Sequence, residues 1–147
     1  MPEDRHWSGE GDEMAGLWGV VVEQSLVDRG ALSPFEALAE LPIGAWRLLL
    51  VRVDESDLAD AVAHLRAGMV PAHEESWYAH FFDDRRLVVV FQDAVFEVTP
   101  DARTWEPVVM HGLTRGVPLE QLDFDPCTVA DARARFGLAA QAPAGVL

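Results

Sequence analysis

The sequence predicts an α+β domain in which a mostly antiparallel sheet of about five strands carries helices packed on one face. Two observations lead to this prediction. Three short segments rich in β-branched and aromatic residues follow one another between residues 77 and 98, and only tight turns separate them. Elsewhere, apolar residues recur at the three- and four-residue spacing of amphipathic helices, most clearly from Leu58 to Met69.

The strands are expected in five segments of the chain. Alternating or continuous apolar runs, bounded by turn residues, mark each one. The segment at residues 46–53 has an unbroken apolar centre, which indicates burial on both of its faces. The predicted strands are Leu17–Val22, Trp46–Val53, Trp77–Phe82, Leu87–Phe91 and Ala94–Val98.

Four helices are expected between and after these strands. The first would begin at Ser33, an N-cap residue followed by proline, and end near Pro42, because apolar residues recur there at helical spacing. Thr104 and Thr128 resemble the N-caps of the last two helices, and Gly112 would let one of them approach the sheet closely. The buried face of the second helix is expected to carry Leu58, Val62 and Leu65.

The predicted elements form one domain. Their order is β-α-β-α-β-β-β-α-α, and a ferredoxin-like arrangement with an added strand is one topology that accommodates it. Neither a repeat nor a long linker interrupts residues 17–137, so we expect a single α+β domain there. Residues 1–16 are acidic and glycine-rich without periodicity, and we expect a flexible tail, as we do for residues 138–147.

The charge of the chain limits its partners. The formal net charge is −14, and all 11 basic residues are arginine. Nucleic-acid binding depends on neutralising phosphates with basic side chains, so we expect no nucleic-acid partner. The negative field also opposes binding to anionic membranes. Without lysine, the chain has neither a Schiff-base residue nor a Walker phosphate loop.

A cytoplasmic location is expected. Cys127 is the only cysteine, which rules out an intramolecular disulfide and fits a reducing compartment. The first residues are acidic and polar, unlike a secretory signal. The apolar runs are also far shorter than a membrane span, so we expect no membrane partner.

The densest group of chemically capable side chains lies in residues 73–82. Tyr78 and His80 are two residues apart on a predicted strand and therefore share a face. A histidine beside a tyrosine in apolar surroundings can act as an acid–base pair, with Glu75 assisting. His80, Tyr78 and Glu75 are thus the candidate catalytic residues, and Trp77, Tyr78 and His80 are the candidate ligand-binding residues. The alternative is a structural histidine, hydrogen-bonded within the core.

No metal site or cofactor is predicted. His73, Glu74, Glu75 and His80 carry ligand atoms, but their spacing matches no metal-binding signature. Cys127 precedes a predicted helix start, where a thiol can have a lowered pKa. A nucleophilic cysteine also needs a positioned base, so a buried structural role is favoured.

Several segments resemble a small prokaryotic protein family of similar length with no known activity. They are the strand Trp77-Tyr78-Ala79-His80-Phe81, the hairpin from Val90 to Phe96, the pair Thr104-Trp105, and the segment Gly116-Val117-Pro118 followed by Glu120-Gln121-Leu122-Asp123-Phe124 and Pro126-Cys127. The resemblance covers roughly residues 17–127, and residues 116–127 are its most specific part. It implies one compact domain and assigns no functional residue.

Two functions from different classes fit these observations. The first is a non-catalytic binding or interaction domain for a small molecule or a protein, acting through an open sheet face or edge, for which a homodimer is one arrangement. The alternative is a small acid–base enzyme, for example of secondary metabolism, with a pocket around Tyr78 and His80. A closed pocket with His80 and a carboxylate would favour the enzyme, and a flat apolar patch would favour the binding domain.

Overall fold

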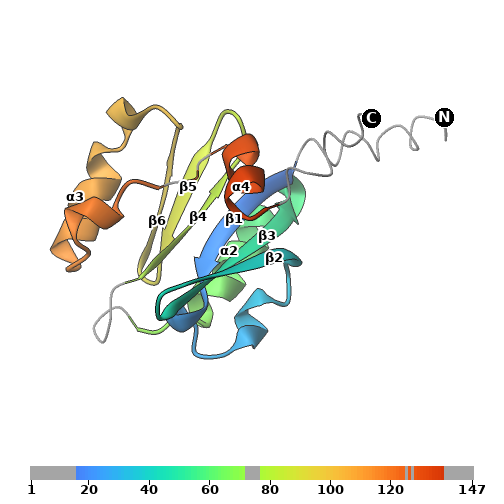
Figure 1. The fold of residues 1–147 in the computed structure, drawn as a ribbon. Helices are drawn as coiled ribbons and strands as arrows, with labels where there is room; N and C mark the ends of the chain where they lie inside the picture. Colours follow the sequence, from blue (N-terminus) through green and yellow to red (C-terminus); the bar gives the residue numbers. More distant parts are fainter. Residues whose placement is uncertain (1–15, 72–76, 125, 127, 138–147) are drawn as a thin grey trace.

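The computed structural model describes residues 16–71, 77–124, 126 and 128–137 (Figure 1). In this part of the chain the fold is α+β, with one open sheet and three α-helices. The strands are β1 (Gly16–Val22), β2 (Glu36–Ile43), β3 (Trp46–Asp54), β4 (Tyr78–Phe82), β5 (Leu87–Phe91) and β6 (Ala94–Val98). The helices are α2 (Leu58–Ala67), α3 (Glu106–Thr114) and α4 (Val129–Arg135).

The six described strands lie in the order β2-β3-β1-β4-β5-β6, and every neighbouring pair is antiparallel. The predicted meander from β4 to β6 is confirmed. Because β3 and β4 both run antiparallel to β1, they are parallel to each other, with β1 between them and α2 as their connection. A ferredoxin-like fold needs two such split β-α-β units. The described residues form one, so that topology is not confirmed, and the sheet has six strands in place of five.

The prediction that the helices pack on one face is wrong, because both faces of the sheet are covered (Figure 1). Leu65 of α2 packs with Val51 and Phe81 on one face. Val108 of α3 and Ala132 of α4 pack on the other. The reason lies in the central strands, since every residue of β5 is buried. A strand that is apolar on both faces needs a covering layer on each.

Strand β2 replaces the helix that the sequence predicts from Ser33 to Pro42. It pairs with β3, and the register shifts between Ala37 and Ala39, as at a β-bulge. The extra residue changes the alternation, so that Leu38 and Leu41 pack against the same apolar cluster although they are three residues apart. The bulge therefore imitates helical spacing. Pro42 is tolerated because β2 is an edge strand of the described sheet.

The last two helices begin differently from each other. The predicted cap at Thr128 is confirmed, since its hydroxyl accepts a hydrogen bond from the backbone N–H of Asp131 at 3.1 Å. The predicted cap at Thr104 is wrong, because Trp105 occupies the N-cap position of α3. The Thr104 hydroxyl instead contacts Thr99, at 3.1 Å from its Oγ1 atom.

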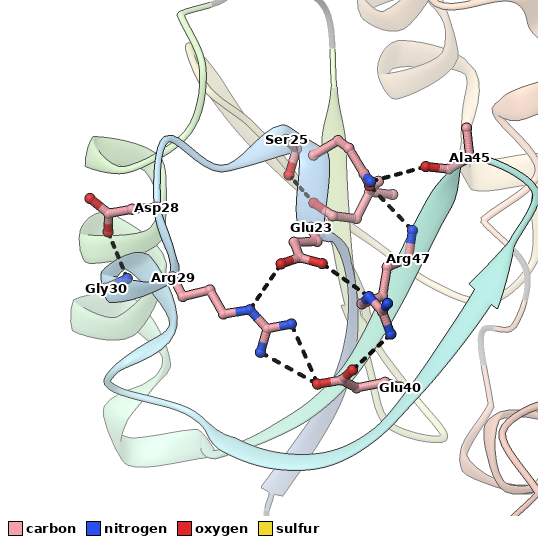
Figure 2. A network of polar contacts seen from close by, with 10 residues as sticks. Glu23, Ser25, Asp28, Arg29, Gly30, Glu40, Ala45 and Arg47 are labelled. Carbon is pink, nitrogen blue, oxygen red and sulfur yellow. Dashed lines mark hydrogen bonds and ion pairs between the residues drawn. The ribbon is translucent and has the colours of Figure 1, made fainter.

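A ring of four charged side chains fastens the β1–β2 connection to the edge of the sheet (Figure 2). The Glu23 carboxylate lies 3.1 Å from Arg29 Nε and 3.2 Å from Arg47 Nε. The Glu40 carboxylate lies 3.4 Å from Arg29 Nη1 and 3.1 Å from Arg47 Nη1. Each carboxylate thus contacts both guanidinium groups. A single exposed ion pair contributes little to the stability of the fold, but several charges joined in a network contribute more.

The burial of α2 generates the first prediction. Val62 and Leu65 are buried as the helical period requires, Leu58 is half-buried, and His64 is exposed. Val62→Asp should lower the free energy of unfolding by about 3–5 kcal/mol, because it places an uncompensated charge in the core. Urea denaturation measures the loss. The control is Ala63→Asp, which adds the same charge at an exposed position of the same helix. Equal stabilities for the two variants would contradict the packing of α2.

Candidate functional site

His80 lies in a row of side chains that crosses all six described strands. On the face covered by α3 and α4, strand pairing aligns one residue from each strand. The row reads Ala39, Leu50, Val20, His80, Val89 and Phe96. His80 is the one polar member of this row. Because its neighbours in the row have apolar side chains, its imidazole needs a hydrogen-bond partner from outside the sheet.

The imidazole of His80 is buried and hydrogen-bonded to the main chain. The residue is 4% exposed, and its Nε2 atom lies 2.7 Å from the carbonyl oxygen of Pro126. Because a carbonyl oxygen can only accept, Nε2 carries the proton and donates it. The rings of Tyr78 and Phe82 lie 6.0 Å and 5.6 Å from the imidazole between centroids. His80 is therefore held in one orientation among aromatic side chains.

Tyr78 is fixed in the same way. Its hydroxyl donates a hydrogen bond to the carbonyl oxygen of Gln121, and its ring packs edge-on against Phe124 with 5.3 Å between centroids. Burial raises the pKa of the hydroxyl, and the negative charge of Asp123 raises it further, while a hydrogen bond with the backbone of Phe124 lowers it. The net pKa lies well above the ordinary value of 10.0, so the phenol is neutral at physiological pH.

Both side chains are covered by residues 117–124 and by Pro126, which together we call the covering segment. Val117, Leu122 and Phe124 of this segment are buried against the sheet. The Cβ of an alanine at Gly112 would come within 2.7 Å of Leu122, so Gly112 permits a close approach to this segment and not, as the sequence predicted, to the sheet. Phe124 is fully buried, and its backbone φ is +46°, a value that residues other than glycine rarely adopt.

The predicted site residues do not gather in one place. Tyr78 and His80 share a face, as expected. Trp77 packs against the opposite face, where its ring lies 5.6 Å from the ring of Trp46 between centroids. Glu75 and Cys127 lie outside the described residues, so the roles predicted for them stay predictions. The predicted tails also lie outside, except that Gly16, the last residue of the predicted N-terminal tail, begins β1.

An exposed apolar area lies at the turn between β2 and β3, where Trp46 contacts Trp77. Ile43 and Trp46 flank the turn between β2 and β3 and are 47% and 38% exposed. We call Ile43, Trp46 and Trp77 the tip surface. Gln24 holds the turn, because its Nε2 donates to the Ala45 carbonyl at 3.0 Å and its Oε1 accepts from the Arg47 N–H at 3.2 Å. The two exposed side chains thus lie on a hairpin whose turn is hydrogen-bonded to Gln24.

Sequence reasoning missed a cluster of charged side chains at the β5–β6 turn. The Asp93 carboxylate accepts hydrogen bonds from Arg115 Nε at 2.7 Å and His111 Nε2 at 3.2 Å. The His111 ring packs edge-on against Phe91, with 4.7 Å between centroids. No spacing signal could have revealed the cluster, since its members come from a turn and a helix about 20 residues apart. It ties the C-terminal end of α3 to the hairpin.

Among the described residues, no group of three histidine, cysteine, aspartate or glutamate side chains converges as a metal site. No helix in this part of the chain is long and apolar enough to cross a membrane. Comparison of the sequence with protein-family models, and of the chain with curated proteins and solved structures, found no match. The resemblance to a small prokaryotic family therefore stays a prediction.

The hydrogen bond between His80 and Pro126 generates a stability prediction. His80→Ala should lower the free energy of unfolding by about 1–3 kcal/mol, because the Pro126 carbonyl loses its donor and a cavity forms beneath it. His80→Gln should lose less, since its amide can still donate. Denaturant unfolding compares both with His64→Ala, which removes an imidazole whose hydrogen bond to the Gly30 carbonyl is exposed to solvent and should therefore cost less stability. Wild-type stability in both His80 variants would show that this hydrogen bond contributes nothing.

The Asp93 cluster generates a pH prediction. Burial tends to raise the pKa of Asp93, but the hydrogen bonds and positive charges of Arg115 and His111 outweigh it, and the net pKa lies below the ordinary 3.8. A carboxylate with a lowered pKa stabilises the fold above pH 3.8, and this contribution disappears as the pH falls through its native pKa. Asp93→Asn should therefore unfold more easily at neutral pH and lose less stability on acidification.

Thermal melts of Asp93→Asn between neutral pH and pH 3 or so would measure this difference. Asp84→Asn is the matched control, because it removes the same charge from an exposed turn position. If both variants follow the same pH curve, the ion pairs of Asp93 do not contribute to acid stability.

Proposed function

We propose that this protein is a non-catalytic interaction domain that binds a protein partner through the tip surface. The observation that carries the proposal is the exposure of Ile43 and Trp46 on a hairpin that Gln24 holds in place. Large apolar side chains that remain exposed on a rigid element are typical of binding surfaces. Trp77 belongs to this surface, which supports its predicted role in ligand binding.

Energetics favour such a surface. Tryptophan is enriched among the few residues that dominate protein–protein affinity, because it buries a large area and loses little conformational freedom. A hairpin that is already ordered reduces the entropy lost on binding. The charged ring of Glu23, Arg29, Glu40 and Arg47 joins the same hairpin to the chain that precedes it, and so adds to its rigidity.

The partner is expected to be a different protein with a basic rim. A net charge of −14 repels a second copy of the chain and attracts positively charged surfaces over distances of about one Debye length, ~8–10 Å. A homodimer through the tip surface is the alternative occupant. The composition also supports a cytoplasmic location without nucleic-acid partners, and these remain part of the proposal.

The acid–base enzyme is less well supported. A catalytic base must reach the proton that it abstracts, and a catalytic acid needs a pKa near the working pH. The Nε2 proton of His80 is committed to the Pro126 carbonyl, and the pKa of Tyr78 is raised away from neutrality. Activity at this pair would require the covering segment to move.

Site-specific photo-crosslinking tests the interaction. A benzophenone amino acid placed at Ile43, which leaves Trp46 in place, should give one discrete adduct in the cells of origin, and the same group at the exposed Met110 of α3 should not. The captured protein is then purified. Trp46→Ala should weaken its binding by more than about tenfold, because a central tryptophan contributes at least about 1.4 kcal/mol, whereas Met110→Ala should leave binding unchanged.

The adduct also identifies the occupant. A heterologous adduct whose affinity falls with rising salt supports the basic partner. An adduct of twice the chain's mass would replace it with a homodimer. If adducts at Ile43 and Met110 are the same, or if Trp46→Ala binds the captured protein normally, the tip surface is not the binding site.

A further inference from the structure

The two edges of the described sheet are not alike. Strand β6 forms one edge (Figure 1), and its pairing with β5 keeps one register throughout, with neither a bulge nor a proline. Strand β2 forms the other edge and carries both features, which hinder the pairing of an edge strand with another chain. Strand β6 is therefore the edge that can accept a further strand.

The main chain of β6 has hydrogen-bonding groups on its outer side. The tight turn pairs Ala94 with Phe91, and alternate residues of an antiparallel ladder turn their N–H and C=O groups to the same side. The groups of Val95 and Glu97 thus point away from β5. None of the described residues bonds to them. We call the N–H and C=O groups of Val95 and Glu97 the β6 edge.

The next outward position along the chain, Thr99, is closed by the protein itself. Its N–H donates to Thr104 Oγ1 at 3.2 Å, and its carbonyl oxygen accepts from Trp105 Nε1 at 2.7 Å. The described chain gives the outward groups of Val95 and Glu97 no comparable partners. A strand added to β6 would therefore make its main-chain hydrogen bonds at these two residues.

The side chain of Val95 defines one requirement for the added strand. Val95 and Glu97 both lie on the α2 face of the sheet, because they pair with Val90 and Val88, which belong to the apolar cluster on that face. Val95 is 40% exposed. An apolar residue opposite it would bury this remaining surface, and such cross-strand pairs stabilise a sheet.

Negative charge is in excess beside Glu97. The guanidinium of Arg86 lies between three carboxylates. Its nitrogen atoms are 3.4 Å from Glu55, 3.9 Å from Asp83 and 3.5 Å from Glu97. One positive charge cannot balance three negative charges, so a basic residue placed opposite Glu97 would be attracted to this position.

We propose that the β6 edge binds an extended segment of another protein by strand addition, and that this segment places a basic residue opposite Glu97 and an apolar residue opposite Val95. In strand addition the main chain supplies affinity and alternate side chains supply specificity. A second copy of β6 is disfavoured, because it would bring two acidic groups to one interface. The β6 edge and the tip surface lie on different edge strands, so neither proposal depends on the other.

Amide hydrogen exchange tests whether the edge is open. In the free protein, the N–H groups of Val95 and Glu97 should exchange at least about tenfold faster than that of Phe96, which points toward β5. NMR at low protein concentration measures all three. Protection of Val95 and Glu97 in the monomer would show that another part of the chain already covers the edge. Protection that grows with protein concentration would identify a second copy, and either result would overturn the proposal.

A designed peptide tests strand addition. The probe is the acetylated and amidated peptide Thr-Arg-Val-Val-Thr, whose arginine and second valine share one face of an extended chain. At millimolar concentration it should shift the amide signals of Val95 and Glu97 and slow their exchange. Methylation of the backbone nitrogens of the arginine and second valine removes the N–H groups that face β6 and should abolish binding. Methylation of the first valine, whose N–H faces away, should not.

Charge changes test the basic residue. Glutamate in place of the peptide's arginine should weaken binding about fivefold, because like charges opposite each other on paired strands repel. Glu97→Gln should weaken binding of the arginine peptide, whereas Glu36→Gln, which removes the same charge from the exposed edge strand β2, should leave it unchanged.

Several results would overturn the proposal. Absence of binding at millimolar peptide, or equal binding of the two methylated forms, would show that no strand is added. Amide shifts at Ile43 and Trp46 in place of β6 would assign the peptide to the tip surface. Equal binding of the arginine and glutamate peptides would contradict the basic residue.

Discussion

The central strands of this sheet are apolar on both faces, and the rest of the structure depends on that constraint. Every residue of β5 is buried, and β1 and β4 send large side chains to both sides. Water must be excluded from both faces of the sheet. Helix α2 therefore covers one face, and α3, α4 and the covering segment cover the other. Close contacts maintain the layers. A Cβ at Gly19 would lie only 2.2 Å from the Phe81 ring, so the glycine lets that ring lie across the strand.

The second layer is partly built from chain that forms no strand or α-helix, and this explains the role of the polar residues on β4. Irregular backbone carries carbonyl groups that must be satisfied when they are buried. Tyr78 and His80 supply donors to two of them, at Gln121 and Pro126. The same two side chains that look catalytic in the sequence therefore connect a covering segment to the sheet.

The edges of the described sheet differ from its centre. Strand β2 carries a bulge, Pro42 and two glutamates, which discourage pairing with another strand. Its hairpin nevertheless presents Ile43 and Trp46 to solvent in a fixed arrangement. Protection of the backbone edge together with exposed apolar side chains at the turn favours recognition by side-chain contacts over strand addition.

The sequence by itself determined the elements whose signal is local. Helix α2 and five of the six described strands follow from periodicity and turn residues, because side-chain direction repeats every 3.6 or 2 residues. It did not reveal β2, whose bulge imitates helical spacing, nor the coverage of both faces. Only the tertiary structure decided the partners of Tyr78 and His80, which lie 43 and 46 residues away along the chain. Contacts between such distant residues leave no periodic pattern in a single sequence, because they depend on how the layers pack.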